Sequence, residues 1–270
     1  MAKLFSPDEP IAPDNKMPTP PLLAIRNVSN AYVSRSHGLF GKKEIKPVLH
    51  HVNLCIAEGE IFGLVGESGC GKTTLARCVM GLIEYEGEIF IDGQQECRDM
   101  SRVARNLPLT RNLPLTRNIP LTRKAQMVFQ DPGASLNPAK KIGWLMEEPL
   151  VIHQLGEPEE RDRRVDEMLI RVGLDPSYKT RRVHELSGGQ KQRVCIGRSL
   201  ILEPRLLIAD EAISSLDVSV GAQILNLFRE LHESLGLGIL FISHNMDAVE
   251  YLCDRIVVMK QGICEESLMI

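Results

Sequence analysis

Glycines, a lysine and hydroxyl residues stand at spacings that suit phosphate chemistry in the segment EIFGLVGESGCGKTTLARCVMGL, residues 60–82. The segment contains the pattern G-x-x-x-x-G-K-T at residues 66–73. Glycines allow backbone N–H groups to point at an anion, and the start of a following helix adds its positive end. Lys72 can then reach the β- and γ-phosphates of a nucleotide, and the Thr73 hydroxyl can ligate Mg²⁺. The predicted phosphate-binding residues are Gly66, Glu67, Ser68, Gly69, Cys70, Gly71, Lys72, Thr73 and Thr74.

The residues on either side of this loop predict the elements that position it. An apolar run over 61–65 has strand character, and a helical pattern follows the loop with Leu75, Val79 and Leu82 on one face. A glycine-rich turn that matches by chance is the weaker interpretation, because strand, loop and helix occur in the required order. Cys70 could be a nucleophile, but no base is identifiable beside it, so we interpret it as a small spacer.

A second segment, ELSGGQKQRVCIGRSLILEPRLLIADEAISSLD at residues 185–217, adds carboxylates to this chemistry. Ser187 is predicted to begin a helix, and the two glycines after it again let backbone N–H groups approach an anion. The apolar strand RLLIADE ends in Asp210 and Glu211. One carboxylate at such a strand end can hold Mg²⁺, and the other can lie beside an attacking water. The alternative is a pair of solvated loop charges.

Length and composition set the limits for any interpretation. A chain of 270 residues can bury one large core, or a core domain with a smaller subdomain. Its 43% apolar and 25% charged residues are ordinary for a soluble globular protein. The net charge of -3 does not favour nucleic-acid binding. No apolar run approaches the roughly 20 residues that cross a bilayer, and residues 1–21 are expected to form a flexible proline-rich tail. Seven cysteines without C-x-x-C pairs indicate neither a zinc site nor a disulfide framework, as expected in a reducing cytosol.

Apolar strand candidates alternate with helical stretches along the chain. This alternation predicts an α/β core with a mostly parallel sheet and ligands at the carboxyl ends of the strands. Residues 139–186 differ, because they contain helical patterns and no strand candidate. There, Val165, Met168, Leu169 and Val172 should share one helical face. The predicted core strands lie at 61–65, 125–129, 206–209, 238–243 and 255–259.

The order of these motifs, with LSGGQ before the paired carboxylates, resembles the nucleotide-binding subunit of an ABC transporter. The match covers about residues 22–264. It implies a P-loop NTPase core of the RecA-like type, an antiparallel β-subdomain and an inserted helical subdomain. In this sequence these parts correspond to a single ATPase domain over 22–264, with β-subdomain segments at 22–60 and 84–124, a helical subdomain at about 135–190 and a short tail over 265–270.

The resemblance also implies roles for further residues. Tyr32 matches the aromatic residue that stacks on adenine, although a tyrosine packed within a β-subdomain is the alternative. Gln130, in QMVFQDP, matches a glutamine that contacts Mg²⁺ and relays contact to a membrane subunit. His244 matches the histidine on the γ-phosphate, and Asp217 matches a residue that crosses to a partner subunit. The implied catalytic residues are Lys72, Gln130, Glu211 and His244, the implied Mg²⁺ ligands are Thr73, Gln130 and Asp210, and the signature residues for ATP are Ser187, Gly188, Gly189 and Gln190.

The resemblance implies a composite active site. In the family, the P-loop of one subunit and the LSGGQ of another clamp one ATP, so the expected partner is a second ATPase subunit in a homo- or heterodimer. Two separate transmembrane permease subunits and an extracytoplasmic solute-binding protein are the other expected partners, and no nucleic acid is expected. ATP would close the dimer, and hydrolysis would reopen it. The expected location is the cytoplasmic face of the inner membrane, as a peripheral protein.

Within the family, VGESGCGKTTLAR, MVFQDPGASLNP and DEAISSLDVSVGAQILNL are most similar to ATPases of oligopeptide, dipeptide and nickel importers. Gly133, the pair Ala212–Ile213, and Asn245 depart from the usual aromatic residue, Pro-Thr and aspartate. The longer tail with a His-Pro-Tyr motif is also absent after GICEESLMI. None of these departures touches the phosphate or Mg²⁺ contacts. The competing class is a soluble ABC ATPase that acts on nucleic acid or ribosomes, which the single cassette without heptads or a metal cluster disfavours.

One feature has no role in this scheme, namely the repeat RNLPLTRNLPLTRNIPLTR at residues 105–123. A proline in every copy should keep this segment extended and exposed, in a loop. We interpret residues 105–116 as a tandem duplication of twelve residues, which a surface loop tolerates. The alternative is a basic arm toward anionic lipid or a partner, formed by Arg105, Arg111 and Arg117.

Overall fold

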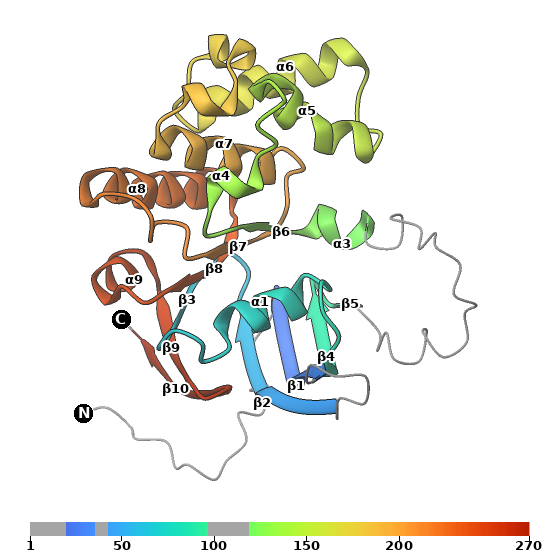
Figure 1. Cartoon of the computed structure of the whole chain (residues 1–270), viewed down its shortest axis with the longest axis vertical. Coiled ribbons are helices and arrows are strands. Elements are labelled where there is room, and N and C mark those ends of the chain that lie inside the picture. The colour runs from blue at the N-terminus through green and yellow to red at the C-terminus, as the bar shows by residue number, and fades with distance from the viewer. Residues whose placement is uncertain (1–19, 36–42, 97–118, 270) are drawn as a thin grey trace.

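The computed structural model describes residues 20–35, 43–96 and 119–269. Their centre is a six-stranded sheet with the strand order β10-β9-β3-β8-β7-β6 (Figure 1). The strands from β9 to β6 are parallel and β10 pairs antiparallel with β9, so the predicted α/β core with a mostly parallel sheet is confirmed. The strands are β3 (Ile61–Val65), β6 (Ala125–Val128), β7 (Leu206–Asp210), β8 (Gly238–Ser243), β9 (Arg255–Lys260) and β10 (Ile263–Met269).

A second, antiparallel sheet of four strands packs beside this core in the order β2-β1-β4-β5. Helix α1 lies between the two sheets in Figure 1, and its buried apolar residues belong to the same cluster as residues of both sheets. The start of α1 therefore reaches the edge where the parallel strands end. The elements are β1 (Leu23–Arg35), β2 (Lys43–Ile56), α1 (Lys72–Val79), β4 (Glu86–Ile91) and β5 (Gln94–Glu96).

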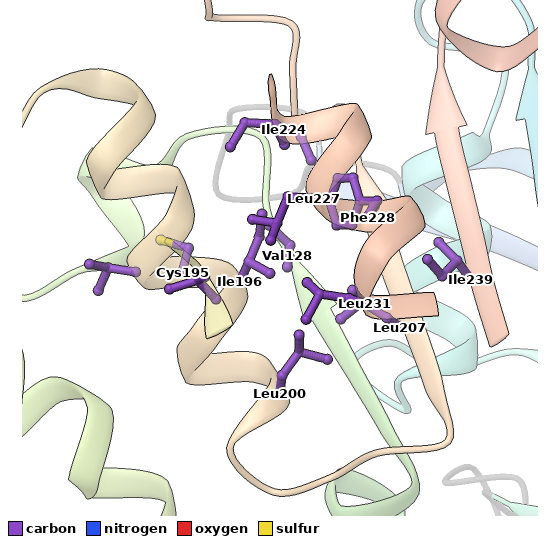
Figure 2. Packing of buried hydrophobic residues seen from close by; sticks show 14 of the residues in the cluster. Val128, Cys195, Ile196, Leu200, Leu207, Ile224, Leu227, Phe228, Leu231 and Ile239 are labelled. Carbon is purple, nitrogen blue, oxygen red and sulfur yellow. The ribbon is translucent and has the colours of Figure 1, made fainter. Parts of the chain in front are cut away.

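Helices α4 to α8, which follow β6, form a layer above the parallel sheet in Figure 1, while α9 lies beside β3. In Figure 2, side chains of α7 and α8 meet those of β6 and β7 around Val128, Ile196 and Leu227. The predicted apolar face of α6 is confirmed, since all four of its residues are buried. The helices are α3 (Ile119–Lys124), α4 (Pro132–Ser135), α5 (Ile142–Ile152), α6 (Pro158–Arg171), α7 (Gly188–Leu200), α8 (Val218–Leu235) and α9 (Met246–Leu252), with 3-10 turns at Pro176–Thr180 and Val183–Glu185.

Three local predictions were wrong. Leu82 does not extend the apolar face of α1, because Gly81 adopts a φ of 61° and closes the helix. The Leu82 N–H then bonds back to the Arg77 carbonyl, and the Leu82 side chain is 56% exposed. The predicted C-terminal tail is instead an edge strand, β10, in which Glu265 also forms an ion pair with Lys260 at 2.7 Å.

The third correction concerns the end of the repeat. Residues 119–123 were predicted to be extended and exposed, but they begin helix α3, and Leu121 is buried. Pro120 does not prevent this because it lies in the first helical turn, where a backbone N–H has no partner inside the helix. The other copies of the repeat lie outside the described residues. Among the described helices, none has the length and apolar character needed to span a bilayer.

Candidate active site

The loop between β3 and α1 curls around the ammonium group of Lys72. The Lys72 Nζ donates hydrogen bonds to the carbonyl oxygens of Gly66 and Glu67, at 2.7 and 2.9 Å. Gly66 must be glycine, because a Cβ at this position would lie 2.2 Å from the Met259 carbonyl oxygen. Gly71, with a φ of 116°, caps the start of α1. The loop therefore holds a buried positive charge at a helix N-terminus, the arrangement that attracts phosphate.

Cys70 lies within this loop and faces inward. Its Sγ accepts a contact from Lys72 Nζ at 3.8 Å, and its backbone carbonyl accepts a hydrogen bond from the Gly262 N–H at 2.8 Å. The Cys70 side chain is buried and belongs to the apolar cluster under the second sheet. These contacts are those of a small packing residue, and the interpretation of Cys70 as a spacer stays a prediction.

Asp210 ends strand β7 and faces Thr73 at the start of α1. The Thr73 hydroxyl donates a hydrogen bond of 3.1 Å to Asp210 Oδ1, so residues far apart in sequence meet at the carboxyl end of the sheet. Burial raises the pKa of the Asp210 carboxyl above its usual range, and the neighbouring Glu211 charge adds to the rise. The Thr73 hydrogen bond and the charges of Arg77 and Lys72 oppose it. A hydroxyl and a carboxylate are oxygen donors of the kind that Mg²⁺ prefers.

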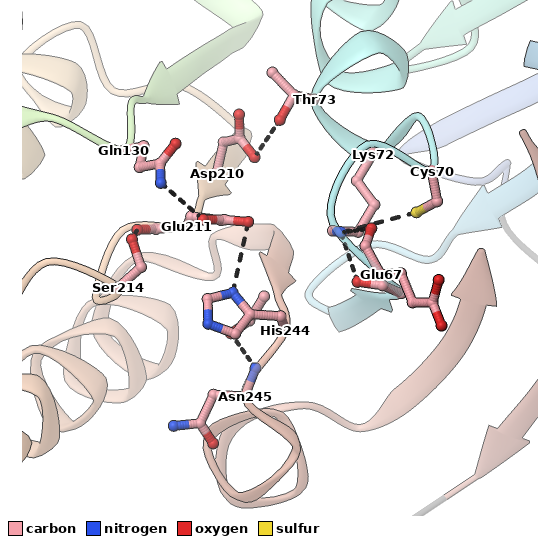
Figure 3. A network of polar contacts seen from close by, with 12 residues as sticks. Glu67, Cys70, Lys72, Thr73, Gln130, Asp210, Glu211, Ser214, His244 and Asn245 are labelled. Carbon is pink, nitrogen blue, oxygen red and sulfur yellow. Dashed lines mark hydrogen bonds and ion pairs between the residues drawn. The ribbon is translucent and has the colours of Figure 1, made fainter. Parts of the chain in front are cut away.

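Glu211 follows directly and is held between two loops (Figure 3). Gln130 donates a hydrogen bond of 2.9 Å from Nε2 to Glu211 Oε2, while His244 Nδ1 lies 3.6 Å from Glu211 Oε1. The three residues follow β6, β7 and β8, which are neighbours in the sheet, so the topology brings them together. Glu211 also has a φ of 49°, a left-handed conformation that a non-glycine residue rarely adopts. Such strain is typical of functional positions.

The loop that carries His244 is fixed on its other side by Asn245. The Asn245 N–H donates to Ser243 Oγ at 3.0 Å, and its side-chain Oδ1 accepts from the Ala248 N–H at 3.1 Å as the N-cap of α9. Asparagine and aspartate cap helices about equally well. The departure from aspartate at this position therefore preserves the local structure.

A cavity of about 200 Å³ opens where these groups converge. Polar groups dominate its wall, with backbone and side chains of the glycine loop on one side and Gln130 and Glu211 on the other. The structure thus joins the loop before α1 with the residues after β6 and β7 in one site. The lining residues are Ser68, Gly69, Gly71, Lys72, Thr73, Thr74, Gln130 and Glu211.

Other residues implied by the resemblance lie elsewhere. Tyr32 is a 42% exposed residue of β1 that pairs with Lys46 of β2, and it does not line the cavity. Ser187 caps α7 through a hydrogen bond of 3.3 Å from the Gln190 N–H. Asp217 caps α8. The roles of these residues toward ATP stay predictions.

The signature segment has supporting contacts that sequence reasoning missed. Gln190 donates from Nε2 to the Tyr178 hydroxyl at 2.9 Å, while its Oε1 accepts from the Ser187 N–H at 3.0 Å. A Cβ on Gly189 would lie 2.5 Å from Val220 Cγ1, so α7 and α8 approach closely there. No pattern in the sequence marks Tyr178, because its partner lies twelve residues away across a turn.

Comparisons with known proteins agree with this geometry. The family model described as ABC transporter matches residues 49–214. A Brucella ovis protein named as a peptide import ATP-binding protein is 42% identical over 90% of this chain and 70% of its own length. The oligopeptide transport ATP-binding protein AppF of Bacillus subtilis is 43% identical over 89% of this chain and 70% of its own length.

A solved structure shows the same fold. It is a dimeric ATP-binding cassette in a post-hydrolysis state, bound to ADP and Pi, with a TM-score of 0.74 and 29% identity. The match covers 92% of this chain and 98% of the other. Together with the family model and the relatives, it establishes that this chain belongs to the ABC transporter family.

Proposed function

We propose that this chain is the ATP-hydrolysing subunit of an importer for small peptides, and that it drives transport through separate permease subunits. The observation that carries this proposal is the position of Glu211, whose carboxylate lies between Gln130 and His244 at the wall of the cavity. A carboxylate held there can act on water next to phosphates bound by the loop around Lys72.

ATP binding follows from the charge and the backbone of the loop. Lys72 is 5% exposed and is bonded to two carbonyl oxygens of its own loop. Phosphate oxygens attract the ammonium group more strongly than carbonyl oxygens do, because they carry negative charge. The ammonium group would therefore bond to the β- and γ-phosphates, while N–H groups at the start of α1 bind the remaining oxygens.

Hydrolysis requires a water molecule in line with the γ-phosphorus. Glu211 would accept a proton from this water as its oxygen bonds to phosphorus and the bond to the ADP oxygen breaks. Gln130 and His244 orient the Glu211 carboxylate, since both contact it from opposite sides. Mg²⁺ would supply positive charge to the phosphates, and the groups that would hold it are the Thr73 hydroxyl, the Asp210 carboxylate and the Gln130 amide oxygen.

A second ATPase subunit completes the site in this proposal. Ser187 and the two glycines after it form the start of α7, where backbone N–H groups can meet an anion, but they do not line the cavity of their own chain. Their positions support binding to the ATP of a partner subunit. The structure to which this chain is similar is likewise a dimeric cassette.

The proposed cargo and partners rest on the relatives. Proteins more than 40% identical over about 90% of this chain are named for peptide or oligopeptide transport. A small peptide is therefore the proposed cargo, and nickel or another metal complex is the alternative that the sequence left open. Two permease subunits and an extracytoplasmic solute-binding protein complete the proposed transporter, which places this chain at the cytoplasmic face of the inner membrane.

Two assays test the proposal in turn: phosphate release from ATP, and uptake of the transported substrate into vesicles. The purified chain, alone and with permease subunits in vesicles, should release phosphate from ATP in the presence of Mg²⁺ and lose this activity with EDTA. Vesicles that also contain the solute-binding protein should accumulate labelled trialanine, and Ni²⁺ serves as the second substrate. Absence of MgATP hydrolysis in both preparations would overturn the enzymatic assignment, while uptake of Ni²⁺ alone would overturn the peptide assignment.

A further inference from the structure

Gln192, on α7, buries a side-chain amide that forms no hydrogen bond within the described part of the chain. Its side chain is 0% exposed, and within the described part of the chain neither Nε2 nor Oε1 has a hydrogen-bond partner. Asn30, His153 and Arg198 also leave one buried atom unpaired, but each forms a hydrogen bond through another atom. A buried amide without partners lowers stability, and an apolar side chain of the same size would avoid this cost.

The neighbours of Gln192 on α7 show which way its face points. Cys195 Sγ donates to the Pro132 carbonyl at 3.8 Å, and Ser199 Oγ donates to the Met127 carbonyl at 3.4 Å. Residues spaced by three and four share one face of a helix, so Gln192 continues this row by one turn toward the start of α7. The acceptors also advance along the chain, from β6 to α4. Gln192 is therefore the next donor position in a row that follows the segment between β6 and α4.

This place connects two parts of the proposed ATPase. On one side, α4 begins two residues after Gln130, which contacts Glu211 in the cavity. On the other side, the start of α7 carries Ser187, five residues before Gln192. A helix of four residues leaves its last carbonyl groups without partners inside the helix, so α4 offers acceptors for an amide.

We propose that Gln192 is a positioning residue, whose amide bonds to the backbone of α4 when nucleotide is bound and so locks α4 to α7. The inference rests on the proposed function and adds one coupling to it. With α4 and α7 locked, the position of Gln130 relative to Ser187 at the start of α7 stays fixed while the site is closed. Within the described part of the chain the same amide is unpaired, and the proposed bond forms when bound nucleotide moves α4 against α7.

The first test uses Gln192→Met, which keeps the length of the side chain and removes the amide. Without nucleotide, the Tm should rise by about 2–4 °C, because the unpaired groups are gone. The Kd for MgATP should stay within about twofold, whereas kcat should fall about tenfold, because the lost bond belongs to the closed site. Trp144, the single tryptophan, lies on helix α5, which contacts α7. Its fluorescence should change less on MgATP addition in Gln192→Met than in the unsubstituted chain.

Ser199→Ala is the matched control on the same face of α7. Its hydroxyl already donates a hydrogen bond to the Met127 carbonyl in the structure, so the substitution should lower the Tm and leave kcat unchanged. Opposite signs for the two Tm changes would show that Gln192, unlike Ser199, is unpaired before nucleotide binds. A structural role for Gln192 would instead lower the Tm of Gln192→Met, and this result would overturn the proposal.

One more outcome of Gln192→Met and one further experiment also test whether Gln192 couples α4 to α7. A higher Tm together with a normal kcat would mean that the unpaired amide has no role, which also overturns the proposal. Hydrogen exchange requires no substitution at Gln192, and the backbone of residues 132–136 should become more protected when MgATP is added to the Glu211→Gln chain. Unchanged protection in a chain that binds ATP would contradict the coupling while leaving the proposed ATPase intact.

Discussion

Replacement of Glu211 by glutamine tests the chemistry most directly. The amide keeps the shape of the side chain and can still accept the hydrogen bond that Gln130 donates at 2.9 Å. The left-handed backbone at Glu211 is retained as well, because the substitution begins beyond Cβ. What is lost is the ability to accept a proton from water. Glu211→Gln should therefore bind ATP and close the dimer, but hydrolyse slowly.

The expected magnitude follows from the role of a general base. Loss of such a base slows a reaction by about 10²–10⁴-fold, which corresponds to about 2.7–5.4 kcal/mol in activation free energy. Stability should change much less. The Gln130 bond becomes neutral, which costs about 1 kcal/mol, while removal of the charge beside buried Asp210 relieves a repulsion that raises the pKa of Asp210. A Tm within about 2–4 °C of the unsubstituted chain is the expected result.

Steady-state phosphate release provides the rate, and size-exclusion chromatography with MgATP shows the trapped dimer. Glu211→Asp is a useful companion variant, because it keeps a carboxylate but withdraws it from Gln130. Turnover near that of the unsubstituted chain in Glu211→Gln would remove Glu211 from its role as base. A large fall in Tm would show instead that the carboxylate has a mainly structural role.

Further substitutions test the other parts of the site. Lys72→Ala should weaken ATP binding about 10- to 100-fold by removing a charge-assisted contact, measured by titration calorimetry, and an unchanged Kd would exclude the loop as the phosphate site. Ser187→Arg should leave ATP binding intact and abolish the MgATP-dependent dimer, whereas Ser187→Ala loses only the cap of α7, worth about 1 kcal/mol. Asp210→Asn should raise the Tm measured without nucleotide at pH 7 and should weaken Mg²⁺ binding. Because folding raises the pKa of Asp210, its carboxylate lowers the stability of the folded chain at a pH above the unfolded pKa. The gain in Tm from Asp210→Asn should therefore shrink toward pH 4. Deletion of residues 105–116, which lie outside the described part of the structure, should leave ATPase and transport rates unchanged, and loss of transport alone would favour the basic arm.

Buried parallel strands were predictable because their residues are apolar on both faces. Strands β3, β7 and β8 are buried throughout, and each begins or ends beside a residue that interrupts the apolar run. The edge strand β10 was not predictable in the same way. Its sequence, ICEESLM, contains polar residues, and its pairing depends on β9 as a partner.

The contacts of Glu211 depend on strand order, which no periodicity encodes. Gln130, Glu211 and His244 each follow an apolar run, and this much can be seen in the sequence. That β6, β7 and β8 are adjacent, and that their ends meet, is a property of the sheet. The resemblance to a known family supplied the three roles, and the structure supplied the distances. Gln192 was missed for a different reason, since a glutamine among charged residues is normally exposed on a helix surface.

The residues that depart from the family pattern have different contacts in the structure. Ala212 is buried, and the partly buried Ile213 packs against the same apolar cluster, so this pair fills apolar space after Glu211 without lining the cavity. Gly133 donates its N–H to Asp131 in the first turn of α4. Asn245 caps α9 as aspartate would, but it places no negative charge beside His244. Of these departures, Asn245 alone removes a charge close to the proposed γ-phosphate site, and it does so while keeping the loop geometry. The departures should therefore leave the catalytic mechanism unchanged. Asn245→Asp should keep the fold but lower the affinity for MgATP, because the added carboxylate repels the γ-phosphate.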